Sequence, residues 1–296
     1  MFNNILGNDN IKELLTNAVK NNKTSHSYMF VGTDGIGKKM IAKEFAKMIL
    51  CTDENKYCGT CKSCIEFDGE NNPDFRIIEP DGNSLKIEQI REFQNKVSEK
   101  PIISNRKVYI INDSDKMTTE AQNCLLKTLE EPPEFVTIIL IGFNESAFLD
   151  TIKSRCMILH FNKISDENIL RFLEENYQTK VNSQIMLEAF QGSIGKAIQL
   201  QDKQKEYEQI ENVIVNLEKR DKIDTLNGAE IIYKAKDEKF EILDYINIIL
   251  LDMARKSGKY ANCINIVEDT KKRLQSNANY DMCIDNMLLK LWEQIN

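Results

Sequence analysis

The stretch FVGTDGIGKKM, residues 30–40, decides how this sequence folds. It continues the apolar run SYMFVG, which is typical of a short buried strand, and it leads into GKKMIAKEFAKMILC, whose apolar spacing predicts a helix. A glycine loop between a strand and a helix is the setting in which the pattern Gly-x-x-x-x-Gly-Lys cradles phosphate. Gly32, Gly37 and Lys38 match this pattern, but Lys39 stands where a serine or threonine would hold a magnesium ion. The loop therefore predicts a phosphate cradle that lacks its metal ligand.

Strands and helices alternate from this loop up to about residue 162. The apolar runs DFRIIEP, KVYIIND and VTIILIGF indicate further strands, with VTIILIGF as the last of them, and helical patterns separate these runs. One such helix, AQNCLLKTLEE, has Thr118 or Thr119 as its cap and is stopped by Pro132 and Pro133. The alternation predicts an α/β domain over residues 1–162, built on a doubly wound parallel sheet.

The pattern becomes wholly helical after Phe161. Ser165 can cap a first helix, GSIGKAIQL begins a later one, and only helical periodicity is present from about residue 205 to the end. We therefore expect a small helical domain over residues 163–204 and a separate all-α domain over residues 205–296.

Composition and charge exclude several classes of protein. The chain of 296 residues has a formal net charge of −7, which argues against a protein that binds nucleic acid through an overall positive charge. No apolar run approaches the length needed to span a membrane, and the first residues lack the basic region and apolar core of a secretory signal. We expect a cytoplasmic protein with no membrane partner.

Four of the eight cysteines lie within the segment CTDENKYCGTCKSC, at Cys51, Cys58, Cys61 and Cys64. This spacing fits a zinc ion held by four thiolates, and a closed shell of four thiolates leaves no position for substrate, so the metal would be structural. Unrelated thiols and an iron–sulfur cluster are the alternatives. The other four cysteines lie in apolar stretches and are expected to be small buried hydrophobic residues.

Several motifs, taken together and in this order along the chain, resemble one family. The sequence resembles bacterial clamp-loader subunits, which are AAA+ proteins of the DNA polymerase III holoenzyme. The resemblance covers roughly residues 1–200. It rests on SYMFVGTDGIGKK, the four cysteines after the first helix, NNPDFRIIEPDGNSLKIEQIR, LLKTLEEPPEF and IKSRC.

This resemblance implies a structure and a set of partners. It implies an AAA+, RecA-like domain over residues 1–162 with a zinc module at 51–64, a helical lid over 163–204, and a collar domain over 205–296 that joins subunits into a ring. The partners would be the gamma/tau and delta subunits of the loader, together with the sliding clamp and primed DNA reached through the assembled complex.

The family contains a motor type, gamma/tau, which hydrolyses ATP, and a stator type, delta-prime, whose ATP site is degraded. Lys39 cannot coordinate magnesium, because an ammonium carries only donors. Asn112 stands where the motor has a metal-holding aspartate, Gly142 or Phe143 stands at the first sensor position, and Gly195 replaces the arginine of the second sensor, with Lys196 beside it. These departures favour a stator with no intrinsic enzymatic activity.

The phosphate loop and the SRC motif remain recognisable. Gly32, Gly35, Gly37 and Lys38 can still present backbone amides and one ammonium to a phosphate. In this family the arginine of SRC, here Arg155, reaches the γ-phosphate bound by a neighbouring subunit and acts there as an arginine finger. Asp113 and Asp115 are expected to cap loops rather than to form a catalytic pair.

Two other functions stay open at this point. One is a gamma/tau-like motor that hydrolyses ATP in its own site, against which Lys39, Asn112 and Gly195 argue. The other is a stand-alone, zinc-bearing nucleic-acid binder, which the acidic balance and the lack of aromatic and basic clusters disfavour.

Overall fold

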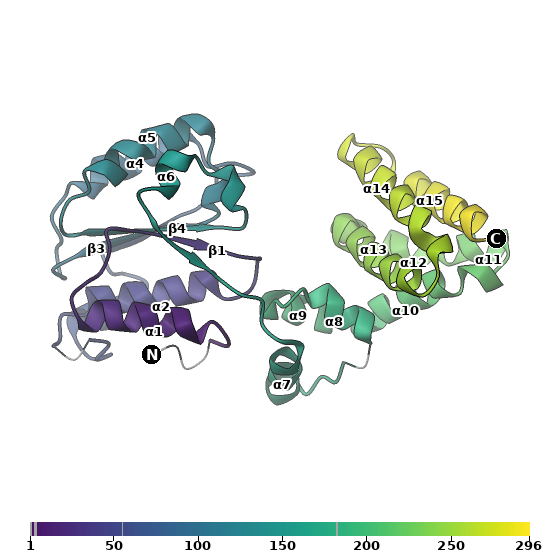
Figure 1. Cartoon of the computed structure of the whole chain (residues 1–296), viewed down its shortest axis with the longest axis horizontal. Helices are drawn as coiled ribbons and strands as arrows, with labels where there is room; N and C mark the ends of the chain where they lie inside the picture. Colours follow the sequence, from purple (N-terminus) through teal and green to yellow (C-terminus); the bar gives the residue numbers. More distant parts are fainter. Residues whose placement is uncertain (1, 3–4, 55, 182) are drawn as a thin grey trace. The chain divides into compact units, whose positions relative to one another are not determined.

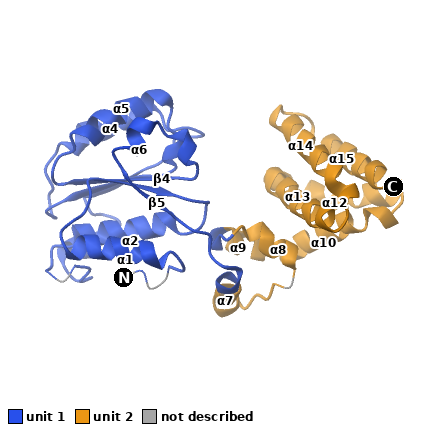
Figure 2. Cartoon of the chain, viewed as in Figure 1, with its two compact units in different colours: residues 1–169, 192–195 blue, residues 170–191, 196–296 orange. Residues whose placement is uncertain are grey.

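The computed structural model describes residues 2, 5–54, 56–181 and 183–296. It contains two compact units, which Figure 2 shows in different colours. The first unit comprises residues 1–169 and 192–195, and the second comprises residues 170–191 and 196–296. The three-part division that the sequence suggests stays a prediction.

The first unit is built on a parallel sheet of five strands, in the order β2-β3-β4-β1-β5. The strand that feeds the glycine loop, β1, thus lies between β4 and β5, with Tyr28 paired to both Ile139 and Met157. All side chains of β1, β3 and β4 are buried, as their continuous apolar runs require. The strands are β1 Ser27–Val31, β2 Phe75–Ile78, β3 Lys107–Ile111, β4 Val136–Gly142 and β5 Met157–His160.

Helices cover both faces of this sheet, which confirms the doubly wound α/β fold (Figure 1). One face carries α1 and α2, and the other carries α4, α5 and α6 (Figure 1). The helices of this unit are α1 Asp9–Lys20, α2 Lys38–Leu50, α3 Lys62–Asp68, α4 Ile87–Val97, α5 Thr119–Glu130 and α6 Asp150–Lys153.

Each face of the sheet has its own apolar core. On the first face the rings of Tyr28 and Phe45 meet edge to face with centroids 5.1 Å apart, and on the second the rings of Phe93 and Tyr109 do the same at 4.9 Å. Burial of these side chains on both faces stabilises the sheet that carries the glycine loop.

The expectation that VTIILIGF forms the last strand was wrong. A further strand, β5, follows the SRC motif and pairs with β1 at the edge of the sheet. Only Leu159 of β5 is buried, while Met157 and His160 are exposed, so this strand lacks the continuous buried run that marks β1, β3 and β4. Arg155 therefore precedes an edge strand instead of following the sheet.

The second unit is helical, with the beginning of α7 belonging to the first unit. Its longest helix, α13, buries Leu243, Ile246 and Leu250 on one face, as their spacing predicts. None of the described helices is both long and apolar enough for a membrane span. The helices are α7 Asp166–Tyr177, α8 Gln184–Phe190, α9 Ile194–Gln201, α10 Gln204–Val215, α11 Lys222–Asn227, α12 Ala229–Lys234, α13 Lys239–Lys256, α14 Ala261–Gln275 and α15 Tyr280–Ile295.

Candidate functional site

The glycine loop connects the carboxyl end of β1 to the first residue of α2, Lys38. Gly32 is required by packing, because a Cβ there would lie 2.7 Å from Cδ1 of Ile36 and 2.9 Å from Cβ of Phe161. Gly35 has φ +72°, a left-handed conformation that side chains disfavour. The loop keeps its shape for reasons that belong to the fold.

Lys38 is folded onto the loop that precedes it. Its Nζ donates hydrogen bonds to the carbonyl oxygens of Gly32 at 2.6 Å and Thr33 at 2.8 Å, and Asp34 Oδ1 lies 3.8 Å away. The side chain is only 6% exposed, and this burial lowers the pKa of Lys38, which the charge of Asp34 partly offsets. Lys38 and the loop glycines therefore still form one compact cationic turn.

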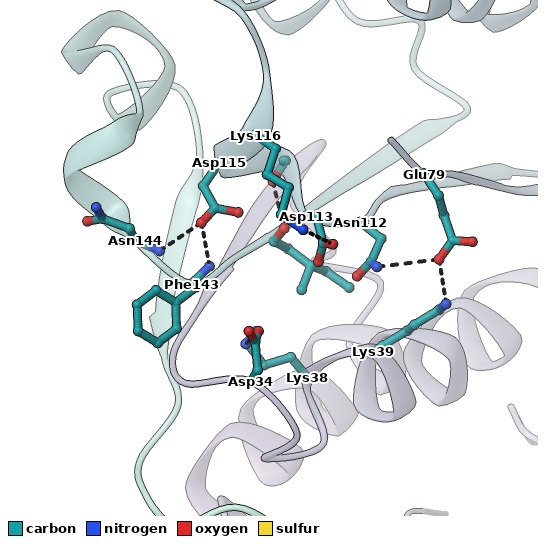
Figure 3. A network of polar contacts seen from close by, with 12 residues as sticks. Asp34, Lys38, Lys39, Glu79, Asn112, Asp113, Asp115, Lys116, Phe143 and Asn144 are labelled. Carbon is teal, nitrogen blue, oxygen red and sulfur yellow. Dashed lines mark hydrogen bonds and ion pairs between the residues drawn. The ribbon is translucent and has the colours of Figure 1, made fainter. Parts of the chain in front are cut away.

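The two positions expected to lose their metal-holding function meet at one carboxylate (Figure 3). Lys39 Nζ lies 2.6 Å from Glu79 Oε1, and Asn112 Nδ2 donates to the same oxygen at 3.4 Å. Magnesium takes oxygen ligands in near-octahedral geometry, whereas this cluster presents two nitrogen donors to one carboxylate. The residues present do not fit a magnesium ion between Lys39 and Asn112.

Glu79 was not identified from the sequence, although a signal for it existed. It directly follows β2, which pairs with β3, and Asn112 directly follows β3. Because the carboxyl ends of parallel strands lie at one edge of the sheet, residues placed just after neighbouring strands come together there.

Asp115 caps a loop, as expected, whereas Asp113 forms an ion pair and caps no backbone group with its side chain. Asp115 Oδ2 accepts hydrogen bonds from the backbone N–H groups of Phe143 and Asn144, both at 3.1 Å (Figure 3). Asp113 pairs with Lys116 at 2.9 Å. Both carboxylates are thus engaged at the carboxyl ends of β3 and β4.

The second sensor segment packs directly on the glycine loop. The backbone N–H of Gly195 donates to the carbonyl oxygen of Gly35 at 3.0 Å, and a Cβ at Gly195 would lie 2.9 Å from the Cα of Gly35. Ser193 is fully buried, and a Cβ at Gly35 would meet its Oγ. Lys196, the possible substitute for an arginine, donates to Gln191 Oε1 at 2.6 Å.

The structure brings Cys51, Cys58, Cys61 and Cys64 together. Their Sγ atoms all lie within 4.8 Å of one another, with 3.6 Å between Cys51 and Cys58 and 4.0 Å between Cys51 and Cys61. Four thiolates about 2.3 Å from a tetrahedral zinc ion have sulfur atoms about 3.8 Å apart. Hydrogen bonds from the backbone N–H groups of Thr60 and Cys61 lower the pKa of Cys58, whereas burial raises the pKa of Cys64. The cluster therefore fits a tetrahedral metal ion such as zinc.

The cysteine cluster is anchored to the sheet by a buried polar network that the sequence did not reveal. Ser63, beside Cys64 on α3, shares a 2.8 Å hydrogen bond with Ser104, whose hydroxyl donates to the carbonyl oxygen of Leu50 at 2.8 Å. The carboxylate of Asp74 accepts the backbone N–H groups of residues 102, 103 and 104 at 2.7–2.8 Å. These bonds hold the end of α2, the start of α3 and the start of β2 together.

Arg155 lies between α6 and β5, and its side chain is 33% exposed. Its guanidinium donates from Nη2 to Glu130 Oε1 at 2.7 Å, and from Nη1 to the carbonyl oxygen of Thr151 at 2.8 Å and to Ser154 Oγ at 3.3 Å. The adjacent Cys156 is packed inward, and burial raises the pKa of its thiol to about 12. Ser154 and Arg155 of the SRC motif are therefore exposed, whereas Cys156 packs inward.

Several known proteins with similar sequences are subunits of DNA polymerase III. The family model for DNA polymerase III, delta subunit, matches residues 7–165. DNA polymerase III subunit delta' of Bacillus subtilis is 37% identical over 160 residues, which cover 54% of this chain and 49% of that protein. DNA polymerase III subunit tau/gamma of Haemophilus influenzae is 35% identical over 210 residues, which cover 68% of this chain and 30% of that protein.

The chain thus matches about half the length, or less, of these curated relatives. Among solved structures, a DNA polymerase III gamma subunit-related protein from Thermotoga maritima superposes with a TM-score of 0.52 at 17% identity, over 97% of this chain and 99% of that one. This likeness shows the fold alone. Because the family model spans more than half of the chain, the chain belongs to the family described as DNA polymerase III, delta subunit, in agreement with the clamp-loader resemblance of its motifs.

Proposed function

We propose that the chain is a non-hydrolysing, delta-prime-like stator subunit of a cytoplasmic DNA polymerase III clamp loader. It would assemble with gamma/tau and delta subunits and help them place the sliding clamp on primed DNA. Residues 1–162 would form the ATPase-fold domain, residues 163–204 a lid, and residues 205–296 the collar that joins the ring.

One observation carries this proposal, the contact of Lys39 and Asn112 with the same oxygen of Glu79. Phosphoryl transfer depends on a metal ion that bridges phosphate oxygens and neutralises the charge that develops on them. Lys39 offers no oxygen ligand for that ion, and Asn112 offers only a neutral amide oxygen, which is a weaker ligand for a hard cation than the carboxylate of an aspartate. Gly195 adds to this argument, because it brings backbone and no guanidinium to the phosphate loop.

Arg155 would be the part of this subunit that acts in catalysis, as an arginine finger at the ATP site of a neighbour. Its partly exposed guanidinium is planar and permanently charged, and it can engage phosphate oxygens in a fork. Such a finger contributes about 10³–10⁵-fold to the rate of phosphoryl transfer.

The cysteine cluster would hold one structural zinc ion, with Cys51, Cys58, Cys61 and Cys64 as its ligands. The bound ion would supply a cross-link between the end of α2 and the start of α3. The chain's own residues already fix that junction from the other side, through the hydrogen bonds of Ser63 and Ser104.

The test compares wild-type chain with Arg155→Ala, alone and in a loader reconstituted with its gamma/tau and delta subunits. The isolated chain should not turn over ATP. The loader with Arg155→Ala should assemble normally yet lose part of its clamp- and DNA-stimulated ATPase, and Arg155→Lys should restore that activity only partly because lysine lacks the fork. Arg91→Ala, which alters an exposed arginine on α4, is the matched control.

A gamma/tau-like motor is the second candidate, favoured by the intact contacts of Lys38 with its loop. A motor would hydrolyse ATP as an isolated chain, and Lys38→Ala would abolish that activity. Stimulated ATPase that is unchanged by Arg155→Ala in a fully assembled loader would rule out the finger.

A further inference from the structure

The guanidinium of Arg155 is held by acceptors from two different helices. Oε1 of Glu130, the last residue of α5, accepts a hydrogen bond from Nη2 at 2.7 Å. The carbonyl oxygen of Thr151, on α6, accepts a hydrogen bond from Nη1 at 2.8 Å. An arginine side chain has many rotamers, and each fixed acceptor reduces the number that it samples. The two anchors together define where this guanidinium points.

The helix that precedes Arg155, α6, is itself fixed to α5. The buried side chain of Gln122, on α5, donates to the carbonyl oxygen of Ala147 at 2.9 Å and accepts the backbone N–H of Leu149 at 2.9 Å. Leu149 is the N-cap residue directly before α6, and Ile152, on α6, is fully buried. Gln122 thus fixes the entry to α6, and Glu130 engages the arginine that follows its end.

We infer that Glu130 is a positioning residue for Arg155. This inference rests on the proposed function, in which Arg155 engages a phosphate bound by the neighbouring subunit. Glu130 would hold the guanidinium extended from α6 before that phosphate is present.

The strength of this pair suits such a role. The side chains of Arg155 and Glu130 are 33% and 50% exposed, and ion pairs at exposed positions are weak because water and salt screen them. A phosphate carries more negative charge than one carboxylate and matches the same fork. The pair therefore restricts the arginine without preventing its transfer to phosphate.

The experiment is a double-mutant cycle on the stimulated ATPase of the reconstituted loader, with Glu130→Gln, Arg155→Ala and the double variant. We expect Glu130→Gln to lower the rate about two- to fivefold, the range that an exposed ion pair supports. In the double variant, Glu130→Gln should have no further effect, because Glu130 acts only through Arg155. Glu131→Gln is the matched control, since Glu131 is an exposed neighbour that makes no ion pair within the described part of the chain.

The outcomes distinguish the two proposals. If the loader with Glu130→Gln is as active as wild type, or more active, the positioning role of Glu130 is overturned, whereas the arginine-finger role is still supported by a loss of activity in Arg155→Ala. Equal losses from Glu130→Gln in the presence and absence of Arg155 show a structural role instead. If Arg155→Ala has no effect, both proposals fail. The melting temperature of each isolated variant shows whether it is folded.

Discussion

The backbone N–H of Gly195 and the carbonyl oxygen of Gly35 are joined by a hydrogen bond of 3.0 Å. By resemblance, Gly195 stands where a motor subunit carries the arginine of its second sensor, and here the backbone of this residue contacts the glycine loop. The segment 192–195 belongs to the same compact unit as the sheet, so this contact lies within that unit.

Gly195→Ala should destabilise the chain by about 1–3 kcal/mol, because the added Cβ would lie 2.9 Å from the backbone of Gly35. Thermal unfolding measures the effect. Gly258→Ala is the control, since a Cβ at Gly258 meets nothing within 4 Å. Equal melting temperatures for the two variants would contradict the close packing.

Zinc should be present at about one ion per chain in protein purified without chelator, as measured by elemental analysis. Cys58→Ser should remove it and lower stability by about 2–4 kcal/mol, or roughly 5–10 °C in melting temperature. Cys124→Ser should retain the metal, because Cys124 lies outside the cluster and donates a hydrogen bond to Gln94 Oε1. Metal-free wild-type protein, or a disulfide among the four cysteines in a reduced sample, would refute the zinc site.

Lys39→Thr combined with Asn112→Asp should create a magnesium site that the natural chain lacks. A hydroxyl and a carboxylate then replace two nitrogen donors at the metal-holding positions. We expect ATP to raise the melting temperature of the double variant only when magnesium is present, and we expect no such dependence for wild type. Turnover should stay absent, because Gly195 still supplies no arginine. Magnesium-dependent stabilisation of the wild-type chain would show that its own residues suffice.

Asp74→Asn should lower stability by about 2–4 kcal/mol. The carboxylate is 2% exposed and accepts three consecutive backbone N–H groups, and an asparagine would turn its own N–H₂ group toward one of them. Chemical denaturation measures the loss, with Asp81→Asn at an exposed loop position as the control. An unchanged unfolding midpoint would mean that the polar network around Ser104 does not depend on Asp74.

The sequence was sufficient to predict the strands whose side chains are all buried. Continuous apolar runs identified β1, β3 and β4. Of the two threonines expected as the cap of α5, Thr118 is the one whose Oγ1 accepts the N–H of Ala121. The strand β5 was missed because it is an edge strand, and three of its four side chains are exposed or only partly buried. Edge strands do not need the apolar run that periodicity detects.

Site residues could be predicted from the sequence where they belong to one short motif. They could not be predicted where they come from segments that are distant in the sequence. The spacing of the cysteines was enough to expect their cluster, because four ligands close in sequence need little of the fold to converge. Glu79 and Gln122 act through hydrogen bonds to residues that lie 25–40 positions away, and only the place of Glu79 directly after a strand hints at its role. The contact of Gly195 with Gly35 forms because residues 192–195 pack on the first unit after residues 170–191 have left it, and no local sequence pattern predicts this.

The tight packing around Gly32 has a consequence for how such sequences diverge. Any side chain at this position would enter the space of Ile36 and Phe161, so mutations there are removed by selection for folding even in a lineage that has given up hydrolysis. Position 39 is under no such constraint, because its side chain is 42% exposed. A glycine loop thus marks the ancestry of a sequence, whereas the residue after its lysine determines whether the loop can help to hold magnesium.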